Sequence, residues 1–256
     1  AEVIQKKGYS GDIVIPETVV SNKVSYKVTA IGHSTFFNCK SLTSISIPDS
    51  VTTIGDSVFA WCESLTSINI SKSVINIGKQ ILEHCKSLTT IVVDENNQVY
   101  DSRDNCNAII HTATNTLIFG CCKTNIPNSV TNIGNSAFES CPSLTAITIP
   151  DSVTSIGDFA FSFCDSLASV IIPNSVMNIG KGAFRCCESL TTINIPDSVT
   201  NIRRLAFSFC KSLSSITIPN GVTTIEENAF EYCESLTSIT IPASVTNIDL
   251  YAFFYC

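Results

Sequence analysis

Residues 47–70 read I-P-D-S-V-T-T-I-G-D-S-V-F-A-W-C-E-S-L-T-S-I-N-I, and most of the remaining chain consists of variants of this stretch. Its closing isoleucine, or an equivalent valine, recurs at positions 15, 47, 70, 93, 126, 149, 172, 195, 218 and 241. Most of these steps are 23 residues long. Repeats of about this length are typical of solenoids. The two longer steps, from 15 to 47 and from 93 to 126, equal one repeat plus an insertion.

Each repeat contains two extended segments and one turn. Residues 65–70 alternate apolar and polar side chains at their end and are rich in β-branched residues, which predicts a strand. A proline at position 48 and its equivalents ends most of these strands. Val51 and Ile54 predict a second, shorter extended segment whose apolar side chains point inward. The spacing of Val58, Phe59 and Cys62 predicts a single helical or 3-10 turn.

One repeat is too small to bury its own apolar side, so the repeats are expected to stack. Stacking places isoleucine over isoleucine, phenylalanine over phenylalanine and cysteine over cysteine. The predicted fold class is an α/β solenoid, with a parallel sheet on the concave face and short helical or 3-10 turns on the convex side. A parallel β-helix is the alternative.

The repeats predict one solenoid domain over residues 1–256. Two apolar runs within residues 1–31, at 12–16 and 20–28, flank a polar turn and predict an N-terminal cap hairpin. Residues 94–121 form the long-repeat insertion, and the last repeat is incomplete at Cys256. Residues 1–8 lack the apolar core of a signal peptide, so the chain is expected to be cytosolic or to have lost a leader.

Composition excludes several classes of function. The chain has 44% hydrophobic and 14% charged residues, which is typical of a folded protein rather than a disordered one. Lys and Arg number 15 against 22 Asp and Glu, for a formal charge of −7. Because no basic run could neutralise phosphates, nucleic acid is not an expected partner. No apolar stretch is long enough to predict a membrane span.

The repeat consensus I-P-x-S-V-T-x-I-G-x-x-A-F-x-x-C-x-S-L-T-x-I-x-I resembles the leucine-rich repeat of BspA-like bacterial surface proteins over nearly the whole chain. The long repeat from 93 to 126 also resembles a variant found in such proteins. The resemblance implies a curved, right-handed leucine-rich-repeat solenoid that is secreted or exposed on a cell surface. It further implies binding to other proteins, such as host extracellular matrix components.

The sequence departs from the commoner leucine-rich repeat at one position after the strand. That repeat carries asparagine there, whereas this chain carries serine, as at Ser50, Ser152 and Ser198. Serine hydroxyls can also bond to neighbouring backbone, so we expect them to hold this turn.

Nine of the thirteen cysteines occupy one position of the repeat. Stacked parallel cysteines would lie about 4.8 Å apart, which is further than the Cβ separation of a disulfide. Zinc needs ligands that converge on a point, so buried core thiols are the expected state and no metal site is predicted. In the insertion a disulfide between Cys106 and Cys121, or between Cys106 and Cys122, is geometrically possible. Free thiols are the favoured alternative.

No catalytic arrangement is predicted. His33, His84 and His111 fall at different positions of the repeat, and no phosphate-binding glycine loop is present. The acidic residues of the insertion, among them Asp94 and Asp101, lack the spacing of a calcium loop and indicate a solvated loop. The chain is therefore not expected to be an enzyme or to need a cofactor.

Two sets of surface residues are candidates for binding. The first set is the outward positions of the longer strand, which would tile an uncharged, hydroxyl-rich sheet. It comprises Ser44, Ser46, Ser67, Asn69, Thr90, Val92, Ala146, Thr148, Ser169, Ile171, Thr192, Asn194, Ser215, Thr217, Ser238 and Thr240. The second set is the aromatic residue before the repeat cysteine in several repeats, at Trp61, Phe163, Phe209, Tyr232 and Tyr255.

Both sets also have a purely structural interpretation. Serine and threonine can simply satisfy an exposed sheet, and the aromatic rings can cover the turn side of the core. The favoured hypothesis is a non-catalytic scaffold that binds proteins or glycans through the concave sheet. A structural spacer that holds another domain away from a cell surface is the alternative.

Overall fold

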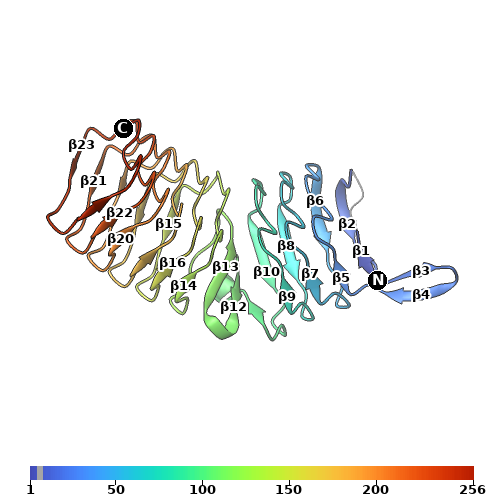
Figure 1. Ribbon diagram of the computed structural model, residues 1–256. Coiled ribbons are helices and arrows are strands. Elements are labelled where there is room, and N and C mark those ends of the chain that lie inside the picture. The colour runs from blue at the N-terminus through green and yellow to red at the C-terminus, as the bar shows by residue number, and fades with distance from the viewer. Residues whose placement is uncertain (5–7) are drawn as a thin grey trace. The chain divides into compact units, whose positions relative to one another are not determined.

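The computed structural model describes residues 1–4 and 8–256, which form two compact units, Ala1–Ala113 and Thr114–Cys256 (Figure 1). We call them the N-terminal and C-terminal units. Within each unit the chain winds in successive turns, here called rungs, that stack through parallel strands. The interpretation of residues 1–256 as one domain stays a prediction.

The N-terminal unit contains two series of parallel strands. Its longer strands are β2 (Gly11–Val14), β6 (Leu42–Ser46), β8 (Ser67–Ile70) and β10 (Thr90–Val93), with β2 paired to β6 and β8 to β10. Its shorter strands are β1 (Glu2–Val3), β5 (Ala30–Ile31), β7 (Thr53–Ile54) and β9 (Asn76–Ile77), paired in that order. The insertion adds β11 (Tyr100–Asp101), the 3-10 helix η1 (Arg103–Asn105) and β12 (Ala108–His111), with β11 antiparallel to β12.

The C-terminal unit repeats this arrangement after the short 3-10 helix η2 (Thr112–Thr114). Its longer strands are β15 (Ala146–Thr148), β17 (Ser169–Ile171), β19 (Thr192–Ile193), β21 (Ser215–Thr217) and β23 (Ser238–Thr240). The other strands are β13 (Thr116–Gly120), β14 (Asn132–Ile133), β16 (Ser155–Ile156), β18 (Asn178–Ile179), β20 (Asn201–Ile202), β22 (Thr224–Ile225) and β24 (Asn247–Ile248). The predicted pair of extended segments per repeat is confirmed.

Identical residues stack in the core, as the repeat predicts. In the C-terminal unit the rings of Phe161, Phe184 and Phe207 are buried and nearly parallel, with centroids 5.3 and 5.8 Å apart. Val51 and Ile54 of the N-terminal unit are both buried, as their spacing predicts. Each rung thus buries its apolar side against its neighbours rather than within itself.

The turns that follow the shorter strands are not helical, which corrects the expected helical or 3-10 turn. The Phe59 amide donates to the Ile81 carbonyl of the next rung at 3.0 Å, and the Trp61 amide donates to Glu83 at 2.8 Å. The amides that alternate with these two donate within their own rung and close short turns. The Cys62 amide, for example, donates to the Phe59 carbonyl at 3.0 Å. Because alternate amides bond between rungs, the backbone cannot keep helical dihedrals, and Trp61 is left-handed with φ 64°.

The N-terminal hairpin forms from different residues than expected. The first apolar run is β2, which pairs in parallel with β6 as an ordinary rung. The hairpin is β3 (Thr18–Ser21) with β4 (Val24–Lys27), and it extends away from the stacked rungs of its unit (Figure 1). All eight of its strand residues are exposed, so it does not cover the core. Residues 5–7 of the expected cap lie outside the described residues.

Three serines at the position after the strand, Ser152, Ser175 and Ser198, bond to backbone in the C-terminal unit, as expected, whereas the Ser244 hydroxyl has no partner among the described residues. The hydroxyls of Ser152 and Ser175 donate to the carbonyls of Val130 and Val153 in the preceding rung, at 2.6 and 2.7 Å. Ser50 has a buried hydroxyl with no hydrogen-bond partner among the described residues, so the arrangement does not extend to every rung.

Candidate binding surfaces

The outward side chains of the longer strands form a continuous surface within each unit, which we call the long-strand face. Strand alternation produces it, because Ile68 and Ile70 point into the core while Ser67 and Asn69 point out. The parallel register then places Asn69 beside Val92 of the next rung. All sixteen predicted positions of this face are exposed or half-buried.

Apolar side chains interrupt the hydroxyl groups of this face. Ile171 in β17 is 78% exposed, and Val14 in β2 is 75% exposed. Val92 in β10 is also exposed. Ile171 lies beside Thr148 in the register of its sheet. The face therefore combines hydroxyl groups with separate aliphatic contacts rather than presenting a uniform polar sheet.

Asn194 differs from the other outward residues because its side chain bonds to the backbone of the preceding rung. Its Oδ1 accepts a hydrogen bond from the Ile172 amide at 2.9 Å, and its Nδ2 donates to the Ile172 carbonyl at 2.8 Å. The side chain thus replaces the backbone pairing where β19 ends. Asn194 therefore supports the sheet, and the repeat pattern alone did not reveal this role.

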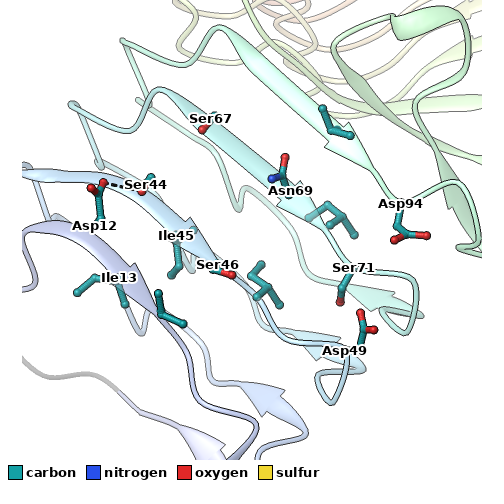
Figure 2. Close-up of a pocket in the computed structure, with 14 residues that line it drawn as sticks. Asp12, Ile13, Ser44, Ile45, Ser46, Asp49, Ser67, Asn69, Ser71 and Asp94 are labelled. Atoms are coloured by element: carbon teal, nitrogen blue, oxygen red, sulfur yellow. Dashed lines mark hydrogen bonds between the residues drawn. The ribbon is translucent and has the colours of Figure 1, made fainter.

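In the N-terminal unit the long-strand face is hollowed by a shallow groove of about 550 Å³ (Figure 2). Asp12 lies on its wall and accepts hydrogen bonds from the hydroxyls of Ser44 at 2.6 Å and Thr43 at 2.9 Å. These two bonds, with that of Ser44 the stronger, lower the pKa of the Asp12 carboxyl. Asp49 on the rim is paired with Lys72 at 2.8 Å. The groove therefore carries the acidic side chains of Asp12 and Asp49.

The C-terminal unit has a second groove on its long-strand face, with a volume of about 420 Å³. Residues of β15 and β17 line it, and among them are Ile171 and the hydroxyl-bearing side chains of Thr148 and Ser169. No charged residue lines this groove among the described residues. The two grooves lie on the long-strand faces of their own units and differ in charge, because acidic residues line only the groove of the N-terminal unit among the described residues.

The predicted aromatic residues before the repeat cysteines all have left-handed backbone. Their φ angles are 64° at Trp61, 58° at Phe163, 61° at Phe209, 57° at Tyr232 and 57° at Tyr255. In the C-terminal unit the last three rings stack, with centroids 4.6 and 4.7 Å apart. In the N-terminal unit the Trp61 ring stacks on the His84 ring, with centroids 3.8 Å apart. Whether these rings contact a partner stays a prediction.

Most of the repeat thiols are buried in the core and bond to backbone, whereas Cys141 is half-buried and Cys256 is exposed. The thiols of Cys164 and Cys187 lie 3.2 Å from the carbonyl oxygens of Phe138 and Phe161, to which they donate. Cys106 and Cys121 belong to different units. The Cys106 sulfur is 3.9 Å from the Ala108 carbonyl, and the Cys121 sulfur is 3.9 Å from the Thr124 hydroxyl. A bridge between Cys106 and Cys121 stays a prediction.

We expect alkaline pH to destabilise the protein through these thiols. Burial raises the pKa of Cys62 from its ordinary value of 9.0 to about 12, and burial also raises the pKa values of Cys164 and Cys187. The folded pKa lies above the unfolded one, so this stabilisation is complete below about pH 9 and is lost toward about pH 12. Thermal unfolding midpoints measured under reducing conditions between pH 7 and pH 11 should fall steeply above pH 9.

A double variant provides the control for this pH dependence. With Cys164→Ala and Cys187→Ala, the fall above pH 9 should be shallower than in the unmodified chain, even though the midpoint at pH 7 is lower. Equal slopes in the two proteins would show that the buried thiols of Cys164 and Cys187 do not contribute to the alkaline loss.

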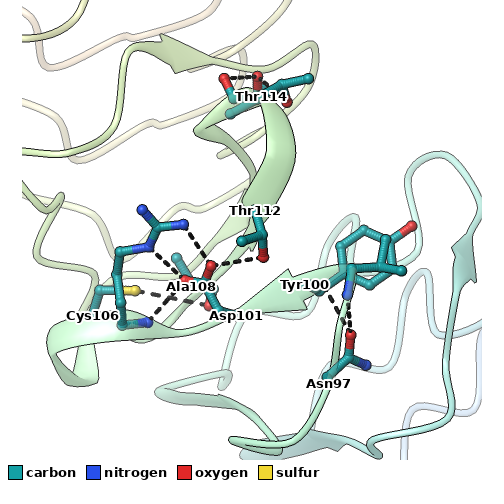
Figure 3. A network of polar contacts seen from close by, with 10 residues as sticks. Asn97, Tyr100, Asp101, Cys106, Ala108, Thr112 and Thr114 are labelled. Carbon is teal, nitrogen blue, oxygen red and sulfur yellow. Dashed lines mark hydrogen bonds and ion pairs between the residues drawn. The ribbon is translucent and has the colours of Figure 1, made fainter.

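The insertion forms a network of polar contacts in the N-terminal unit (Figure 3). The Asp101 carboxylate accepts hydrogen bonds from Arg103 Nε at 2.7 Å and from the Thr112 hydroxyl at 2.8 Å. Asp94 accepts one from the Asn96 amide at 2.8 Å. The described residues contain no group of three or more His, Cys, Asp or Glu side chains that could hold a metal ion. The acidic side chains of the insertion thus hold the loop itself.

Comparison with known proteins assigns the family. Residues 16–130 and 131–256 match the family model described as BspA type leucine rich repeat region, in six copies. The chain belongs to this family. Membership decides between the two predicted architectures in favour of the leucine-rich-repeat solenoid over the parallel β-helix. This family is compatible with a non-catalytic binding or scaffold role. No curated protein matches the chain.

Solved structures similar to this BspA-type chain come from several bacteria. A leucine-rich repeat protein from Eubacterium ventriosum is 24% identical, with a TM-score of 0.66 over 90% of this chain and 80% of that one. A leucine rich cell surface protein from Faecalibacterium prausnitzii is 26% identical, with a TM-score of 0.56 over 100% of this chain and 88% of that one. The pneumococcal vaccine antigen PcpA shares the fold at 19% identity and a TM-score of 0.60, over 94% of this chain and 63% of PcpA.

The elements of this BspA-type chain include few helices. Across the described residues, no helix has the length and apolar character needed to cross a membrane.

Proposed function

We propose that the protein is a non-catalytic binding scaffold on a bacterial cell surface or in secreted form, and that it recognises a protein or glycan through the long-strand face. The observation that carries the proposal is the exposure of Ile171 among uncharged hydroxyl groups. A partner that covers this aliphatic side chain would gain free energy by removing its apolar area from water. Similarity in sequence and fold to a leucine rich cell surface protein from Faecalibacterium prausnitzii supports the location.

The groove of the N-terminal unit supports the same proposal. Val14 and Val92 line it as exposed aliphatic side chains. Asn69 adds an amide to the same groove (Figure 2). An interface that combines apolar anchors with hydrogen-bonding groups is the usual composition of a specific binding site. Host extracellular matrix proteins are the proposed partners.

The test compares partner capture by the chain and by a charged variant. Ser169→Lys, Ile171→Lys and Thr217→Lys together place three cations on the long-strand face and leave Asn194 to support the sheet. The immobilised proteins are incubated with host extracellular matrix proteins and glycans, and the retained components are identified. We expect the variant to lose the components that the unmodified chain retains.

A charge-matched control carries Ser143→Lys, Ser166→Lys and Ser189→Lys, all at exposed positions outside the long-strand face. It should retain the partners of the unmodified chain. If the variant with three cations on the face folds normally and keeps every partner, binding through this face is wrong. A role as a structural spacer would then be the better account.

A further inference from the structure

A guanidinium group is held between aromatic rings on the turn side of the C-terminal unit. The Arg185 guanidinium carbon lies 5.2 Å from the ring centroid of Phe163 and 6.0 Å from that of Phe209. In this rung the position before the repeat cysteine is Cys186, which is buried and left-handed. Because Cys186 replaces the aromatic residue of this rung, a gap remains between the rings of Phe163 and Phe209, and the Arg185 side chain occupies it.

The charge of Arg185 is not compensated among the described residues. Arg103, Arg203 and Arg204 are each paired with a carboxylate, whereas Arg185 has none within 4.0 Å. Its Nε is buried without a hydrogen-bond partner. Glu188, three residues along the chain, is paired with Lys211 at 2.7 Å. A half-buried cation without a counter-ion is costly, and an anionic ligand would remove that cost.

The aromatic rings beyond Arg185 present their edges rather than their faces. Phe209 and Tyr232 stack with an interplanar angle of 16°, and Tyr232 and Tyr255 stack with an angle of 14°. Stacking covers the ring faces, so the accessible parts are the edges and the tyrosine hydroxyls. Ring edges carry partial positive charge and hydroxyls donate hydrogen bonds, so this surface favours anions.

We propose that this surface, formed by Arg185 with Phe163, Phe209, Tyr232 and Tyr255, binds an acidic polysaccharide. Arg185 pairs with a carboxylate or sulfate group of the polymer, and the polymer then follows the ring edges along the stack. This site is separate from the long-strand face, so it does not depend on the function proposed above.

The spacing of the rings disfavours an extended acidic peptide as the ligand. Successive rings repeat every 4.6 to 4.7 Å. Side chains on one face of an extended peptide repeat about every 6.6 Å, which does not match the rungs. A peptide also gains affinity from main-chain hydrogen bonds. Here the amides of Phe209 and Tyr232 already donate to Glu231 and Phe254 of the next rung.

The test measures binding of four polymers to the purified chain by calorimetry. Polygalacturonate supplies carboxylates, dextran sulfate supplies sulfate esters, dextran is neutral and poly-L-glutamate is an acidic peptide. We expect at least one of the two acidic polysaccharides to bind, with an affinity that falls as salt increases. The polymer that binds identifies the anion. Dextran and poly-L-glutamate should bind at least about tenfold more weakly.

Variants assign the binding to Arg185. Arg185→Gln and Arg185→Met both remove the charge, and Met keeps apolar packing between the rings. Each should weaken binding at least about tenfold, the effect of losing one charge-assisted hydrogen-bonded pair. Arg203→Gln removes an exposed arginine that is paired with Glu226, and it should leave the affinity within about twofold.

Three results would overturn the proposal. They are no binding of either acidic polysaccharide, equal binding of poly-L-glutamate, and unchanged affinity in both Arg185 variants. Circular dichroism of each variant shows whether the rungs remain folded. None of these results bears on partner capture by the long-strand face, so the two proposals can fail separately.

Discussion

Replacing Phe184 by alanine is expected to lower the free energy of unfolding by about 3 to 5 kcal/mol. The ring is buried between Phe161 and Phe207, with centroids 5.3 and 5.8 Å away and interplanar angles of 6° and 2°. Truncation removes apolar contacts on both sides and leaves a cavity. The neighbouring rungs cannot close it, because backbone hydrogen bonds between rungs fix their separation, as from Phe184 to Ala206 at 2.9 Å.

Urea unfolding followed by circular dichroism measures this loss. Thr217→Ala is the control, because Thr217 is exposed at the end of β21, and its effect should stay within about 0.5 kcal/mol. Phe184→Leu fills part of the cavity, so its loss of unfolding free energy should lie between those of Phe184→Ala and Thr217→Ala. A loss below about 1 kcal/mol in Phe184→Ala would contradict the stacked-column account of the core.

Replacing Asn97 by alanine is expected to destabilise the N-terminal unit by about 2 to 5 kcal/mol. The side chain is buried, and its Nδ2 donates to the carbonyls of Ser71 and Val74, both at 2.9 Å. Its Oδ1 accepts from the amides of Val99 and Tyr100, also at 2.9 Å. Alanine removes the side-chain partner of all four backbone groups, two of them in the preceding rung, and of these the Ser71 carbonyl still accepts from the Val74 amide at 3.2 Å.

The neighbouring asparagine provides the control for this prediction. Asn96 is exposed, and its side chain bonds only to Asp94 in the same loop at 3.2 Å. Asn96→Ala should therefore change stability by less than about 1 kcal/mol. Asn97→Asp keeps the acceptor oxygen but faces the two carbonyls with a second oxygen, so it should also destabilise. Equal losses of stability in Asn97→Ala and Asn96→Ala would show that the hydrogen bonds of the Asn97 side chain do not stabilise this rung.

Much of the fold follows from the period of the sequence. The 23-residue spacing of isoleucine, phenylalanine and cysteine predicts which side chains stack, because parallel rungs place equivalent positions over one another. The alternation at Ser67 to Ile70 predicts the inward and outward sides of β8 in the same way. The exposed positions of the long-strand face are therefore readable from sequence alone.

Features that depend on contacts between rungs could not be predicted from the pattern. The spacing of Val58, Phe59 and Cys62 is compatible with a helical turn, and only the hydrogen bonds to the next rung make the turn left-handed at Trp61. A lone Asn194 looks like any outward polar residue until its pairing with Ile172 is seen.

The arginine site could not be predicted from the repeat consensus either, because it depends on residues at which one repeat departs from that consensus. Arg185 precedes Cys186, which stands at the position that carries an aromatic residue in the adjacent repeats. The two rings that flank Arg185 are 22 and 24 residues away in sequence. A signal was nevertheless present, because the aromatic series is interrupted only once between Phe163 and Tyr255. The residue next to such an interruption is the one to inspect.

The central claim is that a partner contacts the long-strand face while the inward columns only hold the stack. Site-specific photo-crosslinking tests it most directly, with a photoreactive phenylalanine placed at Ile171 or at Met177 and the chain exposed to the captured partner. Both side chains are exposed, at 78% and 55%, but Met177 lies beyond the strand. The account predicts a covalent adduct from position 171 and none from position 177. An adduct from position 177 alone would contradict it.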